Sequence, residues 1–133
     1  MNIFIDTSAF LAVLDEGDSN HRAAKPFWER IINEGDLLLC HNYVLVETSA
    51  LALRRLGIEA ARVFEQSIVP ILQIVWVTEG IHAAAVSAHL VAGRRSLSLV
   101  DCVSFEVMRR TGIRTAFAFD RHFLDYGYEL RPN

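Results

Sequence analysis

Four acidic residues in this sequence have the side-chain type and the positions needed to hold a divalent cation. Each falls at or just beyond the boundary of an expected strand or helix: Asp6, Glu47, Asp101 and Asp120. Carboxylates a few ångströms apart raise one another's pKa, and a hard cation with oxygen ligands relieves this repulsion. Mg²⁺ or Mn²⁺ suits a site made only of carboxylates, whereas zinc prefers histidine or thiolate ligands. Because Mg²⁺ binds phosphate oxygens alongside carboxylates, the pattern indicates phosphoryl chemistry.

The expected strands and helices bring these residues to one edge of a sheet. Short apolar runs alternate with longer amphipathic segments, which is typical of a parallel sheet covered by helices. We expect strands at 2–5, 37–40, within 71–77 and at 115–119, a candidate fifth at 128–130, and helices at 8–14, 21–33, 44–56, 58–69, 79–92 and 100–110. Asp6 and Asp120 then directly follow strands, while Glu47 and Asp101 lie in the first turns of helices that begin at the same edge. This is the carboxyl edge, where open α/β sheets bind ligands.

Each acid also has a purely structural explanation. Asp6 and Asp120 could be helix N-caps after strands, and Ser98 to Asp101 has the spacing of a capping box. Glu47 is harder to explain in this way, because a carboxylate on an apolar helix face seldom lacks a partner. Its apolar neighbours are Tyr43, Val44, Ala50 and Leu51. The coincidence of the four acids favours a shared site.

Composition places the chain among folded, non-membrane proteins. The 133 residues, 52% hydrophobic and 22% charged, predict a single domain over residues 1–133. A net charge of −3 argues against binding nucleic acid by bulk positive charge, although not against holding phosphate through a metal. Cys40 and Cys102 are expected to be reduced core thiols. No apolar run approaches the ~20 residues that span a bilayer, and Met1-Asn2 lacks the basic start of a signal peptide, so we expect a cytoplasmic protein.

At the acidic positions the sequence resembles the PIN domains, particularly the toxin ribonucleases of VapBC-type toxin–antitoxin pairs. The resemblance spans nearly the whole chain. The segment 2–8 matches the family's first strand and its Asp-Thr/Ser signature, 46–48 its helical glutamate, and 97–101 and 118–123 the segments with the third and fourth acids. It implies a three-layer α/β/α fold, Mg²⁺- or Mn²⁺-dependent endonucleolytic cleavage of single-stranded RNA, dimerisation and inhibition by a small antitoxin.

The residues and the resemblance agree on roles within the site. Asp6 and Asp101 are expected to be the principal metal ligands, and Glu47 and Asp120 to orient a metal-bound water or help hold a second ion. A metal lowers the pKa of bound water, so that hydroxide can attack phosphorus in line with the leaving oxygen. Two hydroxyls beside Asp6 are candidates for positioning water or a phosphate oxygen: Thr7 and Ser8.

Arginine supplies nearly all of the positive charge, since Lys25 is the only lysine. The arginines at expected helix C-termini should lie at the amino edge of the sheet, away from the acids: Arg54, Arg55, Arg109 and Arg110. Those near the acidic segments are better candidates for guiding an RNA backbone: Arg94, Arg95 and Arg121. His122 is expected to border the site.

Two other enzyme classes place acids at the same edge of a sheet, but each lacks a residue that it needs here. A phospho-accepting receiver domain needs a lysine after a late strand, and none follows Lys25. A haloacid-dehalogenase-type phosphatase needs a second Asp two residues after the first, where Ser8 stands. A non-catalytic module whose acidic pocket receives a basic peptide remains open, and the apolar helices 44–56 and 58–69 would suit a protein partner or a homodimer. Binding of Mn²⁺ separates the catalytic from the non-catalytic hypothesis.

Overall fold

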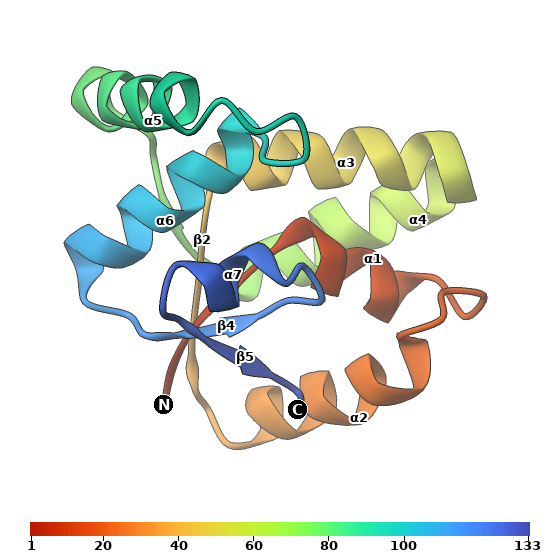
Figure 1. The fold of residues 1–133 in the computed structure, drawn as a ribbon. Coiled ribbons are helices and arrows are strands. Elements are labelled where there is room, and N and C mark those ends of the chain that lie inside the picture. Colours follow the sequence, from red (N-terminus) through yellow and green to blue (C-terminus); the bar gives the residue numbers. More distant parts are fainter.

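The computed structural model describes residues 1–133, and its strands form one sheet with helices against both faces (Figure 1). In chain order the elements are β1 (Asn2–Ile5), α1 (Thr7–Leu14), α2 (His21–Asn33), β2 (Leu37–His41), α3 (Asn42–Leu56), α4 (Ile58–Val63), η1 (Phe64–Ile68), η2 (Val69–Ile71), β3 (Gln73–Val75), α5 (Glu79–Ala92), α6 (Leu99–Thr111), β4 (Thr115–Phe117), α7 (His122–Asp125) and β5 (Glu129–Arg131).

The sheet has five strands in the order β3-β2-β1-β4-β5, and every neighbouring pair is parallel. The central strand β1 is apolar and fully buried at Ile3, Phe4 and Ile5. This is the pattern of a parallel strand that helices cover on both faces. The expected α/β/α fold is therefore confirmed, and the candidate fifth strand is present at the edge of the sheet.

The strand order reverses at β1, with β2 and β3 on one side and β4 and β5 on the other. A reversal of this kind opens a crevice at the carboxyl ends of the strands, where ligands bind in α/β folds. The backbone N–H of Asp6 donates to the carbonyl of Phe117 over 3.0 Å. The ends of β1 and β4 are thus joined directly at the crevice.

The connection from β2 to β3 differs from the expected single pair of helices. The helix expected over 58–69 is an α-helix only as far as Val63, and it continues as the π-helix η1 and the 3₁₀ turn η2, which contains Pro70. Helix α3 crosses the carboxyl edge of the sheet and the chain turns at Gly57, so that α4 runs back alongside it (Figure 1). The chain returns toward the amino edge through α4, η1 and η2, and not along α3.

The segment after β4 also differs from expectation. The strand ends at Phe117 and not at Phe119, and the short helix α7 follows. Asp120 therefore lies in the loop between β4 and α7, three residues beyond the strand.

The apolar residues pack into a core on both faces of the sheet. Its largest fully buried side chains are Phe4, Phe10, Phe64, Phe117 and Phe123. Cys40 and Cys102 are buried and unpaired, as expected, and burial raises the pKa of the Cys40 thiol to about 12. None of the helices combines the length and apolar character that crossing a bilayer requires.

Candidate active site

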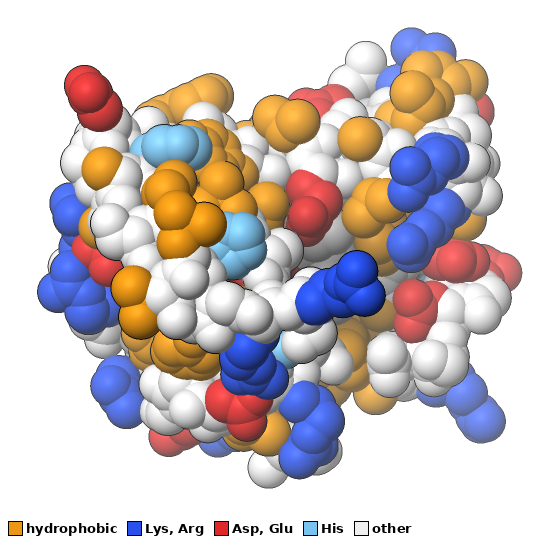
Figure 2. Space-filling model, turned by 45° about the horizontal axis from the view of Figure 1, so that its top comes forward, with side chains coloured by type: hydrophobic (Ala, Val, Ile, Leu, Met, Phe, Trp, Pro, Cys, Tyr) orange, Lys and Arg blue, Asp and Glu red, His pale blue; other side chains and the backbone are white.

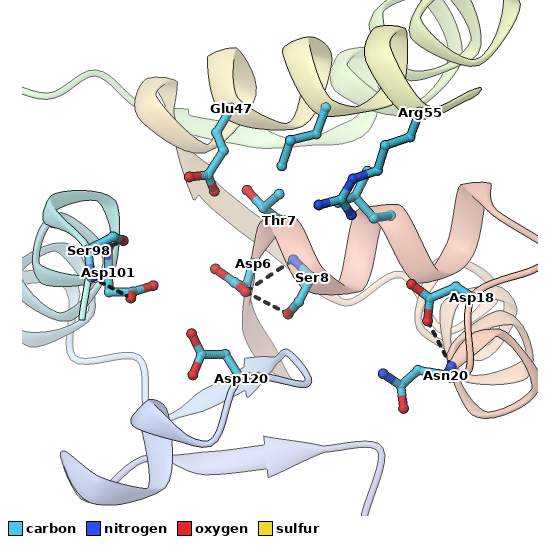
Figure 3. Close-up of a pocket in the computed structure, with 12 residues that line it drawn as sticks. Asp6, Thr7, Ser8, Asp18, Asn20, Glu47, Arg55, Ser98, Asp101 and Asp120 are labelled. Atoms are coloured by element: carbon cyan, nitrogen blue, oxygen red, sulfur yellow. Dashed lines mark hydrogen bonds between the residues drawn. The ribbon is translucent and has the colours of Figure 1, made fainter. Parts of the chain in front are cut away.

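A cavity of about 370 Å³ opens at the crevice between β1 and β4, and all four acids singled out in the sequence line it (Figure 3). Its walls come from α1, α3, the start of α6, the loop after α1 and the loop after β4. The lining residues are Asp6, Thr7, Ser8, Leu11, Asp18, Asn20, Glu47, Leu51, Arg55, Ser98, Asp101 and Asp120. The predicted convergence of the acids is present in the fold.

Asp6 lies at the floor of the cavity, directly after β1, and caps helix α1. One carboxylate oxygen, Oδ2, accepts hydrogen bonds from the Ser8 backbone N–H (3.1 Å) and from Ser8 Oγ (2.6 Å). The residue is only 5% exposed, and this burial raises the pKa of Asp6 from 3.8 to about 7. The two hydrogen bonds from Ser8 oppose the shift, and the charges of Asp101 and Asp120 add to it. The surroundings of Asp6 therefore disfavour the charged form of its carboxyl group.

Asp101 is held by the capping box expected from its spacing to Ser98. Its Oδ2 accepts a hydrogen bond from the Ser98 backbone N–H, and Ser98 Oγ accepts one from the Asp101 N–H, each over 3.0 Å. Burial raises the pKa of Asp101, the hydrogen bond from the Ser98 backbone lowers it, and the charge of Asp120 raises it further. The structural explanation of this residue is thus correct, and it is compatible with a place in the site.

Asp120 is fixed by its neighbour His122. Asp120 Oδ1 accepts a hydrogen bond from the His122 backbone N–H (2.9 Å), and the ring atom Nδ1 of His122 lies 2.7 Å from the same oxygen. One ligand atom from each of Asp101, Asp120 and His122 lies within 4.8 Å of the others, close enough for all three to contact one ion. His122 is therefore nearer to the candidate metal ligands than its expected position at the border.

Glu47 reaches the cavity from α3, and its carboxylate points toward the space between Asp6 and Asp101 (Figure 3). It forms no ion pair with any basic side chain. The next residue, Thr48, is fully buried and donates a hydrogen bond from Oγ1 to Thr7 Oγ1 over 3.1 Å. This bond joins α3 to α1 at the residues next to Glu47 and Asp6, and so helps to hold these two acids in place relative to each other.

The three aspartates share an arrangement that suits a hard cation. Each uses one oxygen to accept a backbone N–H and leaves the other without a hydrogen-bond partner in the protein: Asp6 Oδ1, Asp101 Oδ1 and Asp120 Oδ2. The three side chains point into the same space (Figure 3). Oxygen atoms that are fixed but unpartnered are the donor set that Mg²⁺, Mn²⁺ or Ca²⁺ takes. The residues present therefore fit a divalent ion.

Of the three residues expected to position water or substrate, two lie in the cavity and one lies outside it. Thr7 and Ser8 both line the cavity. The Ser8 hydroxyl is occupied, since it donates to Asp6 and accepts from the Phe119 backbone N–H at 3.0 Å. Arg121 is exposed beside the site and does not line the cavity.

The prediction that Arg55 lies away from the site is wrong, because its side chain lines the cavity (Figure 3). The error follows from the path of α3, which stays at the carboxyl edge along its whole length. Glu47, Leu51 and Arg55 are spaced four apart and so share one face of the helix. Asp18 and Asn20, in the loop after α1, complete this end of the cavity and were also missed. Their loop sequence carries no signal of its own.

The chain belongs to the PIN domain family, whose model matches residues 3–128. The PIN domain is a nuclease fold, and PIN nucleases generally use divalent metal ions. The resemblance stated from the sequence and the expected enzyme class are confirmed at this level.

Individual relatives give a closer comparison. Over 132 residues the chain is 35% identical to the 23S rRNA-specific endonuclease VapC20 of Mycobacterium tuberculosis, and the match covers 98% of both proteins. The crystal structure of VapC20, described as a toxin that cleaves the sarcin–ricin loop, superposes with a TM-score of 0.84 at 33% identity over 95% of each chain. VapBC2 from Rickettsia felis, solved with a DNA fragment from its promoter, has the same fold, with a TM-score of 0.71 at 10% identity over 98% of each chain.

Proposed function

We propose that this protein is a Mg²⁺- or Mn²⁺-dependent endoribonuclease that cleaves single-stranded RNA and acts as the toxin of a type II toxin–antitoxin pair. The observation that carries the proposal is the convergence of Asp6, Glu47, Asp101 and Asp120 on one cavity of a PIN fold. The similarity to VapC20, which acts on 23S rRNA, supports RNA as the substrate. We take the whole of residues 1–133 to act as one catalytic domain.

The residues that line the cavity have different proposed roles in metal binding and catalysis. Asp6, Asp101 and Asp120 would hold the ion through their unpartnered oxygens, with Glu47 completing the site from α3 and orienting water. When bound, the ion supplies a nucleophile at neutral pH and neutralises charge that develops on the phosphate. His122 holds Asp120 in place and offers a nitrogen ligand that Mn²⁺ accepts more readily than Mg²⁺.

The hydroxyls have separate roles in this proposal. Ser8 positions Asp6 and the loop after β4, because its hydroxyl donates a hydrogen bond to Asp6 and accepts one from the Phe119 backbone N–H. Thr7 Oγ1 accepts a bond from Thr48 and still has its own proton to donate to a phosphate oxygen or to water. Arg121 would contact the RNA backbone outside the cavity.

We propose in addition that the protein is cytoplasmic, forms a homodimer and binds a small antitoxin. Large apolar side chains are exposed on α3 and α4 at Leu53 and Ile58, and on α5 at Leu90 and Val91. Figure 2 shows hydrophobic side chains gathered over α5 at the upper left. Exposed apolar groups in such number are typical of surfaces that bind protein. Complexes such as VapBC2 support an antitoxin as one of the partners.

Cleavage by the Asp101→Asn variant tests the catalytic proposal. We expect purified wild-type protein to cut labelled single-stranded RNA with Mg²⁺ or Mn²⁺ and to stop in EDTA. Asp101→Asn should lose activity on the order of 100-fold or more, because it removes an anionic ligand while its amide oxygen still accepts the Ser98 N–H. The matched control is Asp125→Asn, whose exposed carboxylate pairs with Arg94 at 3.8 Å outside the cavity.

Calorimetry with Mn²⁺ separates this function from a non-catalytic acidic pocket. The nuclease should bind the ion, and both Asp6→Asn and Asp101→Asn should weaken that binding. If the wild-type protein binds no Mn²⁺ and cuts no RNA but does bind a basic peptide, the nuclease proposal is wrong. The protein would then be a non-catalytic interaction module.

A further inference from the structure

Arg55 is the only basic side chain among the residues that line the acidic cavity. It is exposed, and it forms no ion pair although five carboxylates line the same cavity. In Figure 3 its guanidinium points from α3 into the cavity, toward Ser8 and on the far side of Thr7 from Asp101. An arginine whose charge is not spent on a neighbouring carboxylate is free to bind an anion from solution.

The spacing along α3 separates Arg55 from the candidate metal ligands. Glu47 and Arg55 are eight residues apart, which is about 12 Å along a helix axis. Leu51 lies between them on the same face, and Leu11 of α1 lines the same cavity. The cavity thus has an acidic end, an apolar middle and a far end. At the far end Arg55 is the only cation and Asp18 the only carboxylate, and Asp18 Oδ1 accepts a hydrogen bond from the Asn20 backbone N–H over 2.8 Å.

These three parts of the cavity follow one another in the same order as the phosphate, the ribose and base, and the next phosphate of a nucleic-acid strand. A phosphate at the acidic end can be held only through a cation, because carboxylates repel it. The ribose and base that follow offer apolar surface to Leu51 and Leu11. The next phosphate along the strand then falls at the far end, where the Arg55 guanidinium can donate two parallel hydrogen bonds.

We propose that Arg55 binds the phosphate next to the one that is cleaved, and so sets the position of the RNA strand in the cavity. The proposal rests on the nuclease function above and adds a substrate contact to it. Arg55 contacts a group that does not react, so it binds substrate and transition state equally. Its loss should then raise KM and leave kcat nearly unchanged.

The matched pair Arg55→Gln and Arg54→Gln tests this role. Arg54 is the neighbouring exposed arginine on α3 and does not line the cavity. With Mg²⁺ and a labelled single-stranded RNA, we expect Arg55→Gln to raise KM roughly 10-fold, the loss typical of a charge-assisted hydrogen bond. Arg54→Gln should match the wild type. The thermal midpoints of both variants should also match it, because neither side chain is buried or paired.

A binding measurement with Mg²⁺, read before cleavage proceeds, gives a second readout that does not depend on kcat. Fluorescence anisotropy of the same RNA should show weaker binding by Arg55→Gln than by Arg54→Gln. The slope of log affinity against log salt should be smaller by about 0.7, the value for one phosphate contact to a single strand. The metal offsets the charge of the carboxylates in all three proteins, so the comparison reports the contribution of Arg55.

The outcomes distinguish failure of this role from failure of the nuclease function. A wild-type protein that cuts no RNA under any metal condition overturns the function, whatever Arg55 does. If the wild type cuts RNA and Arg55→Gln equals Arg54→Gln in both measurements, the phosphate contact does not exist. A fall in kcat at unchanged KM would place Arg55 on the reacting phosphate and would equally overturn the proposed position.

Discussion

Asp6, Asp101 and Asp120 each use one carboxylate oxygen to fix the local chain and keep the other unpartnered. For Asp6 the fixed oxygen caps helix α1, and for Asp101 it completes the capping box of α6 by accepting the N–H of the N-cap residue Ser98. The structural bond and the proposed metal contact would therefore use different oxygens of one side chain and would not compete. A carboxylate held in this way loses little conformational freedom when an ion arrives, which favours tight binding.

The raised pKa of Asp6 predicts a pH-dependent stability for the metal-free protein. Its pKa rises from 3.8 to about 7 on folding, so between these values the folded state binds more protons than the unfolded state. The Asp6 contribution to the free energy of unfolding should then fall as pH rises through this window. His41, whose pKa burial lowers to about 3, contributes a slope of the opposite sign between 3 and 6.5.

Comparison of the wild type with Asp6→Asn isolates this contribution, because His41 is present in both proteins. Asn keeps the cap of α1 and carries no charge to desolvate. In EDTA, urea unfolding should show Asp6→Asn gaining stability over the wild type from about pH 4 to about pH 8, by on the order of 1–4 kcal/mol. A constant difference across this range would mean that Asp6 ionises freely in the apo protein.

Helix α3 is the element that gives the cavity its length. It begins directly after β2, remains at the carboxyl edge, and presents Glu47, Leu51 and Arg55 on one face. It can do so because the chain reverses at Gly57 and α4 carries it back. Gly57 has φ +98° and ψ 179°, a backbone conformation that is essentially restricted to glycine.

Substitution of Gly57 tests how much this turn contributes. Gly57→Ala should destabilise the protein by about 1–3 kcal/mol, the cost of a non-glycine residue in that region. An added Cβ would meet no atom within 4 Å, so the cost lies in the backbone and not in a collision. The control is Gly80→Ala in the first turn of α5, where φ is ordinary and the nearest atom is 3.9 Å away. Urea unfolding should show that control to be neutral or slightly stabilising, since Ala has the higher helix propensity.

The sequence is informative wherever the signal is local. The apolar run of β1 with Asp6 behind it and the Ser98–Asp101 spacing each fix an element and a site residue within a few positions. The direction of a helix is not a local property, because it depends on what the helix packs against. For this reason Glu47 could be placed, since it lies close to β2, whereas Arg55 could not.

His122 and the π-helix η1 show a second limit of what can be predicted from the sequence. The contact of His122 with Asp120 depends on α7, whose four residues are too few for a periodic pattern. In η1 both end residues, Phe64 and Ile68, are buried, as they would also be in an α-helix. No propensity distinguishes such a segment from the α-helix expected over 58–69.

At the scale of the whole molecule, the cavity carries a cluster of negative charge, and the proposed substrate that must enter it, RNA, is negatively charged as well. The net charge of the chain is −3, and the residues that line the cavity include five of its carboxylates and a single arginine. Figure 2 shows Lys and Arg side chains on the surface around the hollow in which acidic side chains lie. The surrounding arginines can attract RNA from solution, but only a cation makes the floor of the cavity compatible with a phosphate.

The stability of the folded protein should therefore depend on a divalent ion. Asp6, Asp101 and Asp120 lie close together in the folded state and are dispersed in the unfolded state, so an ion that binds them binds only the former. At a Mn²⁺ concentration about 100 times the Kd, the free energy of unfolding should rise by about 2.7 kcal/mol. A thermal melt should show a higher midpoint with Mn²⁺, reversed by EDTA, and no such rise in Asp101→Asn. Asp125→Asn should respond as the wild type does. An equal response of all three proteins would mean that the ion binds elsewhere, and no response in any of them would mean that the carboxylates converge without holding a metal.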